Sequence, residues 1–579
     1  MSNIFGSLYI GVSGLMTSQA GIDVTGHNIA NANTEGYSRQ RAVIQTQNPL
    51  LTTPGAFGRG AKLVGVERVY SNTVANNLRN ETSSLNYWSN INTTLDEVNI
   101  YFNELEAGTG LGDALKDYFN AWQNLANIPA DNSDEAQVKK IELISNAEIL
   151  ADKIQENYYH IKDMQDRSNL NIANYIDEVN DIVENIGMLN AEIAKIEAAG
   201  NNANDLRDKR ELLLNKLSEY VDFTSSERPD GQIGVFVGGV TLVDSEVVNK
   251  LYAVNNEENN NYVDIYWGPK GVNEPVVNIT SKISSGKLGA EVKSRDEILP
   301  EYLASLSTLA VALIQETNRI HATGIGLERF NSITSTNSVL NPTVAFSKNE
   351  GKFPYDVTSG TLRIALYNSE NEIVDYFDID IDPNEDNLNS VIRKINEAGQ
   401  GKLTAGLSSG NSIKITADGG YTFSFVEDTS NFLVAAGLNG FFKGKDASDI
   451  AVNELVKNNT NYIASGKSTA PGDNRNLIDI ANIKFKKVIN NSYTIDEFYS
   501  IFASTIASDK SQANTFYNAK KQSTYQFAIK LEEIKGVSID EEFVNLIKFQ
   551  KAYEANARFI TAVDEMIDKL INGVGIVGR

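Results

Sequence analysis

Hydrophobic residues near both ends of the chain recur at the spacing of helices that pack along one another. Near the N-terminus, Leu8, Leu15, Ile22 and Ile29 stand seven residues apart. Near the C-terminus the recurring positions alternate in steps of three and four, and they are Leu546, Phe549, Tyr553, Asn556, Ile560, Val563, Ile567 and Leu570. This is the a/d spacing of a coiled coil. Because an isolated helix gains little stability without packing, the stripes must pair with each other or with copies of themselves.

The segment that carries the first stripe, residues 1–30, predicts a helix with glycines at positions 6, 11, 14, 21 and 26. Each glycine costs about 1 kcal/mol relative to alanine in a helix interior, so this helix should order only when it is packed. Small residues also allow two backbones to approach closely. Residues 41–70 alternate apolar and polar positions and contain two prolines, which favours extended structure.

A polar loop is predicted over residues 27–40, and its candidate interface residues are Asn28, Asn31, Asn33, Gly36 and Tyr37. Asparagine amides both donate and accept hydrogen bonds, and Gly36 can adopt a positive φ. One interpretation is an ordinary C-terminal turn of a helix. The other is a shape-specific joint whose amides bind backbone groups of a neighbouring subunit. The residues alone leave both open.

The middle of the chain alternates between helical and strand periods. Residues 71–222 are strongly helical, and apolar a/d positions run without a break from 172 to 196, about 40 Å at 1.5 Å per residue. A Gly-Asn-Asn stretch at 200–202 ends this helix and a second begins near Asn204, which predicts an antiparallel helical hairpin. Residues 293–322 and the segment from 481 onward are also helical, with a break near Gly536.

Two segments have the period of strands. Residues 233–243 are rich in β-branched residues around a Gly-Gly turn. The second segment predicts strands at 361–367, 373–381, 412–416 and 421–426, with one helix at 386–398 between the pairs. The segment at 441–480 is rich in Asn and Gly and reads as irregular.

We therefore predict a mainly α-helical, elongated, multidomain fold with inserted β-rich domains, in which the terminal helices pair as a coiled coil, a helical bundle forms a shaft and two β modules lie outside it. The predicted domains are a terminal coiled-coil domain of 1–70 with 536–579, a helical shaft of 71–222 with 290–328 and 441–535, a β-rich module of 223–289, and an outer ββαββ-like module of 329–440.

Charge and composition narrow the function classes. The chain has 51 basic and 75 acidic residues, a net charge of −24, which argues against nucleic-acid binding and against docking on an anionic membrane. No uninterrupted apolar run approaches the roughly 18–20 residues of a spanning helix. There is no cysteine, so disulfides, thiolate metal sites and a cysteine nucleophile are excluded. The first basic residue is Arg39, so neither a cleaved secretory signal nor a twin-arginine signal is indicated.

A search for a reaction finds no convincing motif, so we predict no enzyme, no cofactor and no metal site. The stretch 465–469 resembles the end of a phosphate loop, but the required first glycine is Asn461 here. Three aspartates at 378–382 lack the Gly and Glu of a calcium loop and instead suit a solvated strand face. His27, His160 and His321 are far apart and form no metal pattern, which favours structural or solvated roles.

Long stretches at both ends resemble the bacterial flagellar axial proteins, the family of rod, hook and hook-associated proteins. Residues 7–37 are similar to the N-terminal signature of this family, and Phe549–Met566 is similar to its C-terminal signature. Tyr37–Gln40, the helical stretch 204–218, residues 284–296 and residues 318–324 resemble the hook-associated members in particular. The looser middle part around 361–440 fits the same members.

The resemblance implies a structural subunit at the junction between flagellar hook and filament. It implies homo-oligomerisation in a helical tube, contacts with the hook protein and with a second junction protein (hook-associated protein 3), and export through the flagellar type III channel to the cell exterior. It also implies a cytoplasmic export chaperone on the C-terminal helix. Two alternatives stay open: another rod or hook protein, and an adhesin-like display of the β modules. A wall-cleaving axial enzyme would need a domain with carboxylates placed in a cleft, and the helical and β modules offer no such pattern. The helical stretch at 71–222 argues against a hook protein, whose domains are mostly β.

Overall fold

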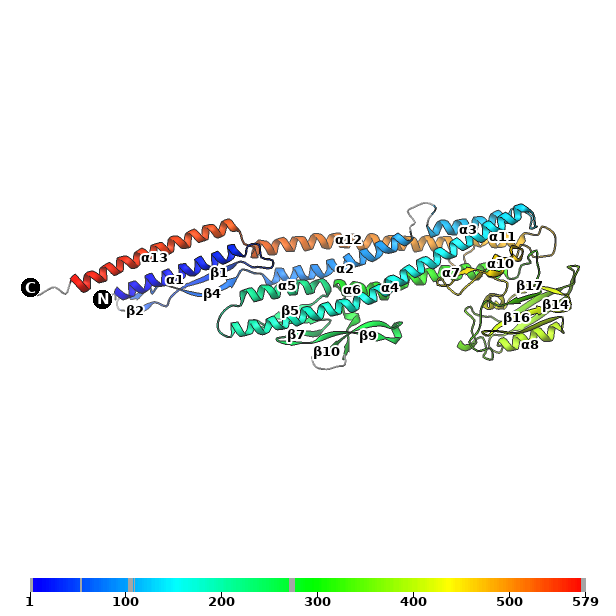
Figure 1. Ribbon diagram of the computed structural model, residues 1–579, viewed down its shortest axis with the longest axis horizontal. Coiled ribbons are helices and arrows are strands. Elements are labelled where there is room, and N and C mark those ends of the chain that lie inside the picture. The colour runs from blue at the N-terminus through cyan, green and yellow to red at the C-terminus, as the bar shows by residue number, and fades with distance from the viewer. Residues whose placement is uncertain (1–3, 53–54, 103–107, 109, 270–275, 574–579) are drawn as a thin grey trace, which may run out of the picture. The chain divides into compact units, whose positions relative to one another are not determined.

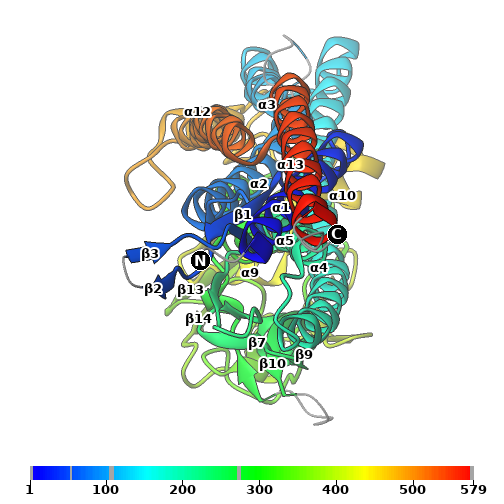
Figure 2. The ribbon, with the colours of Figure 1, turned by 90° about the vertical axis from the view of Figure 1, so that its left-hand side faces the viewer.

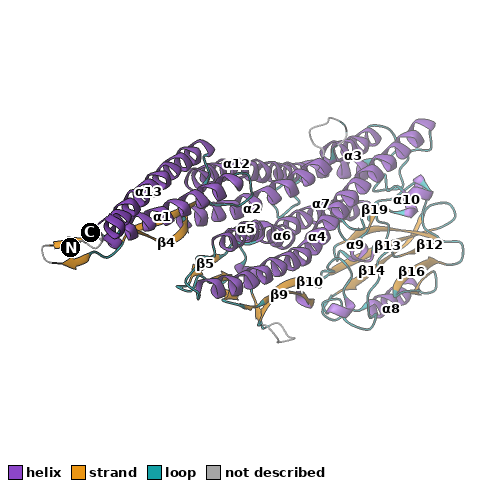
Figure 3. Ribbon diagram, turned by 60° about the vertical axis from the view of Figure 1, so that its left-hand side comes forward, coloured by secondary structure: helices purple, strands orange, loops and turns teal. Residues whose placement is uncertain are grey.

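The computed structural model describes residues 4–52, 55–102, 108, 110–269 and 276–573. Most of them lie in helices, and the strands form several small sheets (Figure 3). The chain divides into two compact units. Unit 1 consists of Met1–Asn92, Arg167–Ser294 and Gln512–Arg579, and unit 2 consists of Thr93–Asp166 and Arg295–Ser511. The predicted class, mainly helical with inserted β-rich parts, is confirmed.

The two ends of the chain meet in unit 1, where α1 (Ile4–Ala30) packs along α13 (Ile539–Gly573) (Figure 1). The predicted pairing of the terminal helices is therefore confirmed. The strands β1 (Gln40–Thr46) and β4 (Ala61–Arg68) form an antiparallel ladder that contacts α1. The helix α1 continues to Ala30, as predicted for residues 1–30, so the first residues of the predicted polar loop, 27–30, are helical, and Asn28 bonds to the backbone of Gln40 from within the helix.

The helical hairpin predicted before and after residues 200–202 is present. It consists of α4 (Asp134–Glu197) and α5 (Asn204–Tyr220). Within unit 1, the apolar stripe of α4 from Ile172 to Ile186 is buried against Leu214 and Leu217 of α5 and against strands of the following β module. This shared apolar core holds the β module on the hairpin.

The β module of unit 1 contains two antiparallel sheets. The first has the strand order β5-β6-β7-β8 and the second β11-β10-β9. Their bounds are β5 (Thr224–Glu227), β6 (Ile233–Val237), β7 (Val240–Asp244), β8 (Val247–Val248), β9 (Lys250–Asn256), β10 (Tyr262–Gly268) and β11 (Val277–Asn278). Gly238 and Gly239 form the turn between β6 and β7 with positive φ, as the sequence predicts.

In unit 1, α2 (Asn72–Phe102) also packs against α12 (Ile495–Lys535). Trp88 stacks on Phe516 with ring centroids 4.5 Å apart, and Lys520 Nζ lies 3.2 Å from a Glu81 carboxylate oxygen. The predicted break near Gly536 is confirmed, since α12 ends at Lys535 and α13 begins at Ile539. Because α2, α4 and α12 each contribute residues to both units, the contacts do not resolve four domains, and the predicted domain limits stay a prediction.

The helical part of unit 2 has an aromatic core. Tyr118 and Trp122 of α3 pack against Phe441 and Phe442, and all four are almost fully buried. The other helices here are α7 (Leu299–His321), α9 (Phe432–Ala436), α10 (Glu454–Asn458) and α11 (Arg475–Ala481), and α3 spans Leu111–Ala126.

One continuous helical stretch, Gly286–His321, is long and apolar enough to cross a membrane by length and composition. In its most apolar segment of 18 residues, 39% is buried inside the protein.

That stretch consists of α6 (Gly286–Lys293), a π-helical turn at Ser294–Ile298, and α7. Within unit 2 the apolar side chains of α7 face the core, including Tyr302, Leu306, Leu309 and Leu313. Short 3-10 turns occur at Glu257–Asn259, Thr280–Lys282, Asn349–Gly351, Thr460–Tyr462 and Asn482–Phe485.

The β module of unit 2 contains the four predicted strands, with β12 and β15 added to the same sheets, and the short β18–β19 pair follows it. The sheets have the orders β14-β13-β17 and β12-β16-β15, and β18 pairs with β19. The bounds are β12 (Ser332–Thr334), β13 (Gly360–Tyr367), β14 (Ile373–Ile381), α8 (Leu388–Gly399), β15 (Leu403–Ser408), β16 (Ser412–Ala417), β17 (Thr422–Asp428), β18 (Phe442–Lys443) and β19 (Ala451–Val452). Asn387 caps α8 by accepting from Ser390 N, a capping box that starts the helix.

Candidate assembly site

The contact between α1 and α13 is built on small residues. Phe549 of α13 lies over Gly21, where an added Cβ would come 2.5 Å from the ring. Ile560 lies over Gly11, with its Cγ1 2.7 Å from such an atom, and Asn556 sits directly on Gly14. The face of α1 that these residues share is buried and comprises Gly11, Ser13, Thr17, Ser18, Gly21, Thr25 and Asn28. Glycine at these points lets the two backbones approach closely.

The hydroxyl groups on this face are satisfied within α1. Thr17 donates to the carbonyl of Ser13 at 3.0 Å, Ser18 to Gly14 at 2.7 Å and Thr25 to Gly21 at 2.8 Å. Because these hydroxyl groups need no partner on α13, the larger side chains of α13 can lie directly against them.

The structure places the predicted stripe of α13 against α1. Val563 is fully buried, and Leu546, Phe549, Tyr553, Asn556, Ile560 and Ile567 are partly buried. Leu570, the last member, remains 53% exposed. The predicted residues of α1, which are Leu8, Leu15, Ile22 and Ile29, are only partly buried and border the small-residue face. Their part in contacts between subunits stays a prediction.

The buried side chain of Asn28, near the end of α1, is the centre of a hydrogen-bond network. It is 1% exposed, and its amide nitrogen donates to the Gln40 carbonyl at 2.8 Å and to Glu542 of α13 at 3.1 Å. Its amide oxygen accepts from the Gln40 N–H at 2.9 Å and from the Tyr37 hydroxyl at 2.7 Å. The full capacity of this amide is thus used inside the chain, which ties α1, β1 and α13 together.

The remaining residues of the predicted polar joint have different positions. Asn31 donates to the carbonyl of His27 at 3.0 Å, which is the contact of a helix C-terminal turn, and Asn33 is exposed. Gly36 has φ of +79°, and an added Cβ would lie 2.5 Å from Leu212 of α5. The turn therefore fits only a residue without a side chain, and it presses the chain against α5.

The four residues Tyr37–Gln40, which we call the hub segment, connect four helices, α1, α5, α12 and α13. Ser38 donates from its backbone N–H to Asp208 of α5 at 2.8 Å and from its hydroxyl at 2.7 Å. Arg39 donates from its backbone N–H to the carbonyl of Lys535 at 2.8 Å and pairs with Glu541 at 3.1 Å. Gln40 donates to Asp205 at 2.8 Å. The hub segment thus fixes the paired terminal helices to α5.

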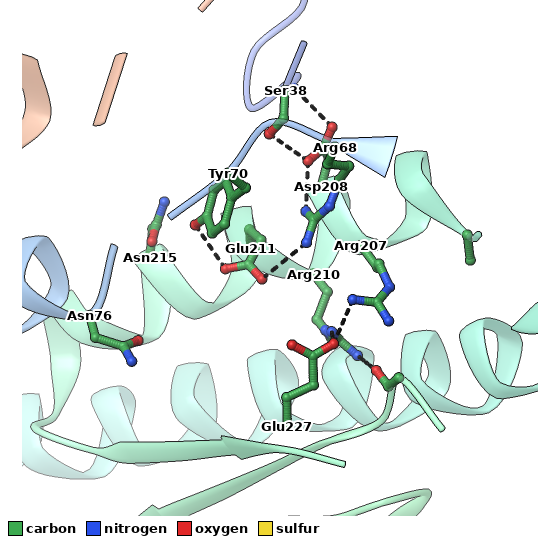
Figure 4. Close-up of polar contacts among 12 residues, drawn as sticks. Ser38, Arg68, Tyr70, Asn76, Arg207, Asp208, Arg210, Glu211, Asn215 and Glu227 are labelled. Atoms are coloured by element: carbon green, nitrogen blue, oxygen red, sulfur yellow. Dashed lines mark hydrogen bonds and ion pairs between the residues drawn. The ribbon is translucent and has the colours of Figure 1, made fainter. Parts of the chain in front are cut away.

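Behind the hub segment, α5 presents a buried ionic cluster (Figure 4). Asp208 accepts from Arg68 at 2.8 Å, and Glu211 pairs with Arg79 and accepts from the Tyr70 hydroxyl at 3.0 Å. These side chains are almost completely enclosed, with at most 10% of each ion-pair member exposed. Such charges stay buried only because each one has a hydrogen-bonded partner of opposite sign.

The environment shifts the pKa of several groups in this cluster. Burial alone would raise the pKa of Glu211, but the positive charges of Arg79 and Arg68 outweigh it, so the pKa of Glu211 is lowered. Burial, followed by the charge of Glu211, raises the pKa of Tyr70, which keeps its hydroxyl a donor. Burial lowers the pKa of Arg210 to about 10, and this guanidinium still donates to Asn190 at 2.9 Å. At neutral pH Glu211 and Arg210 are therefore charged.

Large apolar side chains, almost all of them outside the predicted stripes, stay exposed on both terminal helices. On α1 they are Phe5, Tyr9, Ile10 and Met16, and on α13 they are Ile539, Phe543, Val544, Ile547, Phe559, Met566, Leu570 and Ile571. Apart from Leu570 these residues were not predicted, because a heptad pattern identifies a single face. Counting apolar residues around the whole helix would have found them. A helix pair with so much exposed apolar surface is suited to further packing.

The motifs considered for chemistry have ordinary structural contacts. Asp378 pairs with Arg363 at 2.6 Å on the solvent side of β14, while Ile379 and Ile381 face inward. Residues 465–473 form a loop in which Asp473 accepts from the Ser468 hydroxyl at 2.8 Å, and Lys467 pairs with Asp479. Among the described residues, no three His, Asp or Glu side chains are grouped so that they could hold a metal ion.

The histidines likewise have structural surroundings. His160 stacks on Tyr101 with centroids 4.1 Å apart, and His27 lies 3.6 Å from Asp205. His321 is fully buried in unit 2, where its Nδ1 donates to the Asn439 carbonyl at 2.8 Å and its Nε2 accepts from the Ala464 N–H at 3.0 Å. Burial lowers the pKa of His321 to about 4.

We expect His321 to make unit 2 sensitive to acid. Its pKa is about 4 in the folded chain against an ordinary value of 6.5, so the unfolded state binds the proton more tightly. The contribution of neutral His321 to the free energy of unfolding is complete above about pH 6.5. As the pH drops toward 4, the free energy of unfolding falls by about 3 kcal/mol. Urea unfolding followed by the fluorescence of the buried Trp122, with Trp88 and Trp267 replaced by Phe, measures this loss. In His321→Gln the slope between pH 6.5 and 4 should flatten, and an unchanged slope would contradict the assignment.

Comparisons with known proteins identify family models along the chain. The model described as "Flagellar hook-associated protein FlgK helical domain" matches residues 72–332. The model "Flagella basal body rod protein" matches residues 8–37, and "Flagellar basal body rod FlgEFG protein C-terminal" matches residues 531–573. The two shorter matches cover the paired terminal helices, and the long one covers the helical hairpin with its β module.

Curated relatives match nearly the full length. Flagellar hook-associated protein 1 of Salmonella typhimurium strain LT2 is 24% identical over 579 residues, covering 97% of this chain and 98% of the relative. The Escherichia coli K12 protein of the same name is 25% identical, with the same coverage. The Bacillus subtilis 168 protein of that name is 24% identical over the whole length of both chains. The flagellar hook junction protein FlgK from Burkholderia pseudomallei, a solved structure with TM-score 0.50 and 16% identity, covers 80% of this chain and all of its own and supports the fold.

Proposed function

We propose that this chain, a homologue of flagellar hook-associated protein 1 over nearly its whole length, forms the junction between the hook and the filament of a bacterial flagellum. It is a structural component of the flagellum and assembles in the flagellar axis. The alignment that spans both paired ends and the helical domain between them carries the proposal. A rod or hook protein is the weaker alternative, because the hook-associated helical domain occupies residues 72–332.

Copies of the chain associate through the paired terminal helices into a helical tube. The apolar side chains that α1 and α13 leave exposed, among them Tyr9, Met16, Val544 and Ile547, support this association. Leu8, Leu15, Ile22 and Ile29 belong to the proposed interface, together with the stripe of α13 and the loop residues Asn31 and Asn33. Asn28, Gly36 and Tyr37 contribute by fixing the shape of the hub segment, since their contacts lie within the chain.

The chain is exported through the flagellar type III channel and functions outside the cell. The absence of cysteine from the sequence is compatible with passage as an unfolded chain. Before export, a cytoplasmic chaperone binds the C-terminal helix, whose exposed apolar residues offer a suitable surface. After export, the hook protein lies on one side of the junction and hook-associated protein 3 on the other. The role is structural and not enzymatic, with no nucleic-acid or membrane partner.

Deleting the gene for this chain tests the proposal. Electron microscopy of the deletion strain should show hooks without filaments, and filament protein should accumulate in the medium. Cells should not swim, and a plasmid copy of the gene should restore both filaments and swimming. Filaments of normal number and length on the deletion strain would refute the junction role.

A further inference from the structure

The hairpin formed by β2 (Leu50–Thr52) and β3 (Gly55–Phe57) presents apolar side chains to solvent. Leu50 pairs with Phe57 across the two strands, and they are 54% and 50% exposed, while Leu51 is 81% exposed. In the part of the chain that the structure describes, this sheet has two strands and pairs with no other sheet. The hairpin continues the β1–β4 ladder, since the Gln47 N–H donates to the Gly60 carbonyl at 2.9 Å, so its exposed apolar side chains are held out on an anchored ladder and offer a surface for a partner.

The base of the hairpin is positively charged. Arg59 and Lys62 follow β3 and are both exposed, and the Arg59 guanidinium lies 5.6 Å from the centre of the Tyr9 ring. Figure 2 shows the hairpin extending away from α1 and α13. Strands with exposed Leu50, Leu51 and Phe57, and two basic residues beside them, fit an apolar surface bordered by carboxylates.

The last turns of α13 have that complementary character. Met566 and Leu570 are one turn apart, and they are 50% and 53% exposed. Ile571 beside them is 68% exposed. The exposed carboxylates of Asp564 and Glu565 precede this apolar patch, so negative charge borders it. Within one chain the apolar side chains of the hairpin and those of this patch are both exposed to solvent, so the two surfaces do not cover each other.

We propose that the β2–β3 hairpin of one copy packs on the last turns of α13 of a second copy, with Arg59 and Lys62 facing Asp564 and Glu565. This contact rests on the proposed assembly of the chain into a tube, and it names the partner surface within that assembly. Because each copy carries one hairpin and one patch, the contact is heterologous and can repeat from copy to copy around the tube. The hairpin then acts as an arm that links neighbouring subunits.

Cysteine cross-linking tests the contact directly, because the natural chain contains no cysteine. Two variants, Leu51→Cys and Leu570→Cys, are expressed together in the deletion strain, and the flagella are isolated and oxidised. A disulfide requires Cα atoms roughly 4.4–6.8 Å apart, so only touching segments react. We expect a covalent dimer that needs both variants and disappears on reduction. The control replaces Leu570→Cys with Leu340→Cys, a residue of unit 2 that is 80% exposed, and should give at least tenfold less dimer.

Charge reversal provides an independent measurement. The variant Arg59→Glu/Lys62→Glu should reduce swimming at least fivefold, and combining it with Asp564→Lys/Glu565→Lys should restore at least half of the loss. If flagella assemble but the dimer does not exceed the control, the contact is wrong while the junction role stands. If a cysteine variant fails to assemble, the charge reversal decides, and absence of rescue overturns the contact. Filaments on the deletion strain would instead refute the junction role itself.

Discussion

Replacing Gly21 with leucine is expected to separate α1 from α13 and to stop swimming. An added Cβ at this position would lie 2.5 Å from the Phe549 ring, and the rest of a leucine would extend further into α13. Overpacking of this kind costs about 1–3 kcal/mol, which is large for a pair of helices joined along one narrow face. Hydrogen exchange on the purified chain should show loss of amide protection in both α1 and α13, and soft-agar assays should show no spreading.

The matched control is Gly26→Leu on the same helix. Nothing lies within 4 Å of an added Cβ at Gly26, which is exposed, so this change should only remove a poor helix former and stabilise α1 by up to about 1 kcal/mol. Protection in α1 should therefore rise. If Gly21→Leu and Gly26→Leu gave the same exchange pattern, the close approach of the two helices would not be the basis of their pairing.

The terminal stripes show what periodicity can and cannot reveal. The three-four spacing correctly identified the face of α13 that meets α1, because Phe549, Ile560 and Val563 are large and apolar. On α1 the same rule selected the leucines and isoleucines, whereas the buried face follows Gly14 and Gly21. Small residues have no hydrophobic signal of their own. Only the surplus of glycines in a helix indicated that close packing was expected.

The hub segment shows a second limit. The sequence marked Tyr37–Gln40 by resemblance, and the polar loop by its composition, but it could not show that Ser38 binds Asp208. The two residues are 170 positions apart, and each has many possible partners among 75 acidic residues. Local periodicity contains no information on such a pairing. A buried ionic cluster becomes visible only when the fold brings α5 against the strand β4.

The β modules were predicted well where strands alternate clearly and turns contain glycine. The strands β13 and β14 lie almost where the pattern placed them. The strand β15 was missed because Thr404, Ala405 and Gly406 give little apolar alternation, and the short β12 has only three residues. Both are recruited by pairing with β16, which is a tertiary effect.

Replacing Glu211 with glutamine is expected to destabilise the packing of α5 against α2 and β4 by about 3–5 kcal/mol. The change leaves Arg79 buried without its carboxylate, and it replaces the charged acceptor of the Tyr70 hydroxyl with a neutral amide oxygen. Amide exchange within α5, a local measurement that does not require two-state unfolding of the whole chain, should accelerate at least a hundredfold. The matched control is Glu178→Gln, since Glu178 pairs with Lys216 of α5 at 3.7 Å and both are about half exposed, so its loss should be below about 1 kcal/mol.

A double variant distinguishes two causes of the lost stability: a buried Arg79 charge without a partner, and the loss of packing around Glu211. In Arg79→Met/Glu211→Leu both members of the pair become apolar, and Arg68 retains Asp208 at 2.8 Å. If the uncompensated guanidinium causes the loss, the double variant should be more stable than Glu211→Gln alone, because replacing a whole buried ion pair with apolar residues is often neutral.

The pH dependence of stability distinguishes the same two causes. The pKa of Glu211 is lowered in the folded chain, so its contribution is complete above its ordinary value of 4.5 and is lost as the pH falls further. That loss should be absent from the double variant, and its persistence there would assign the acid sensitivity of α5 to other carboxylates.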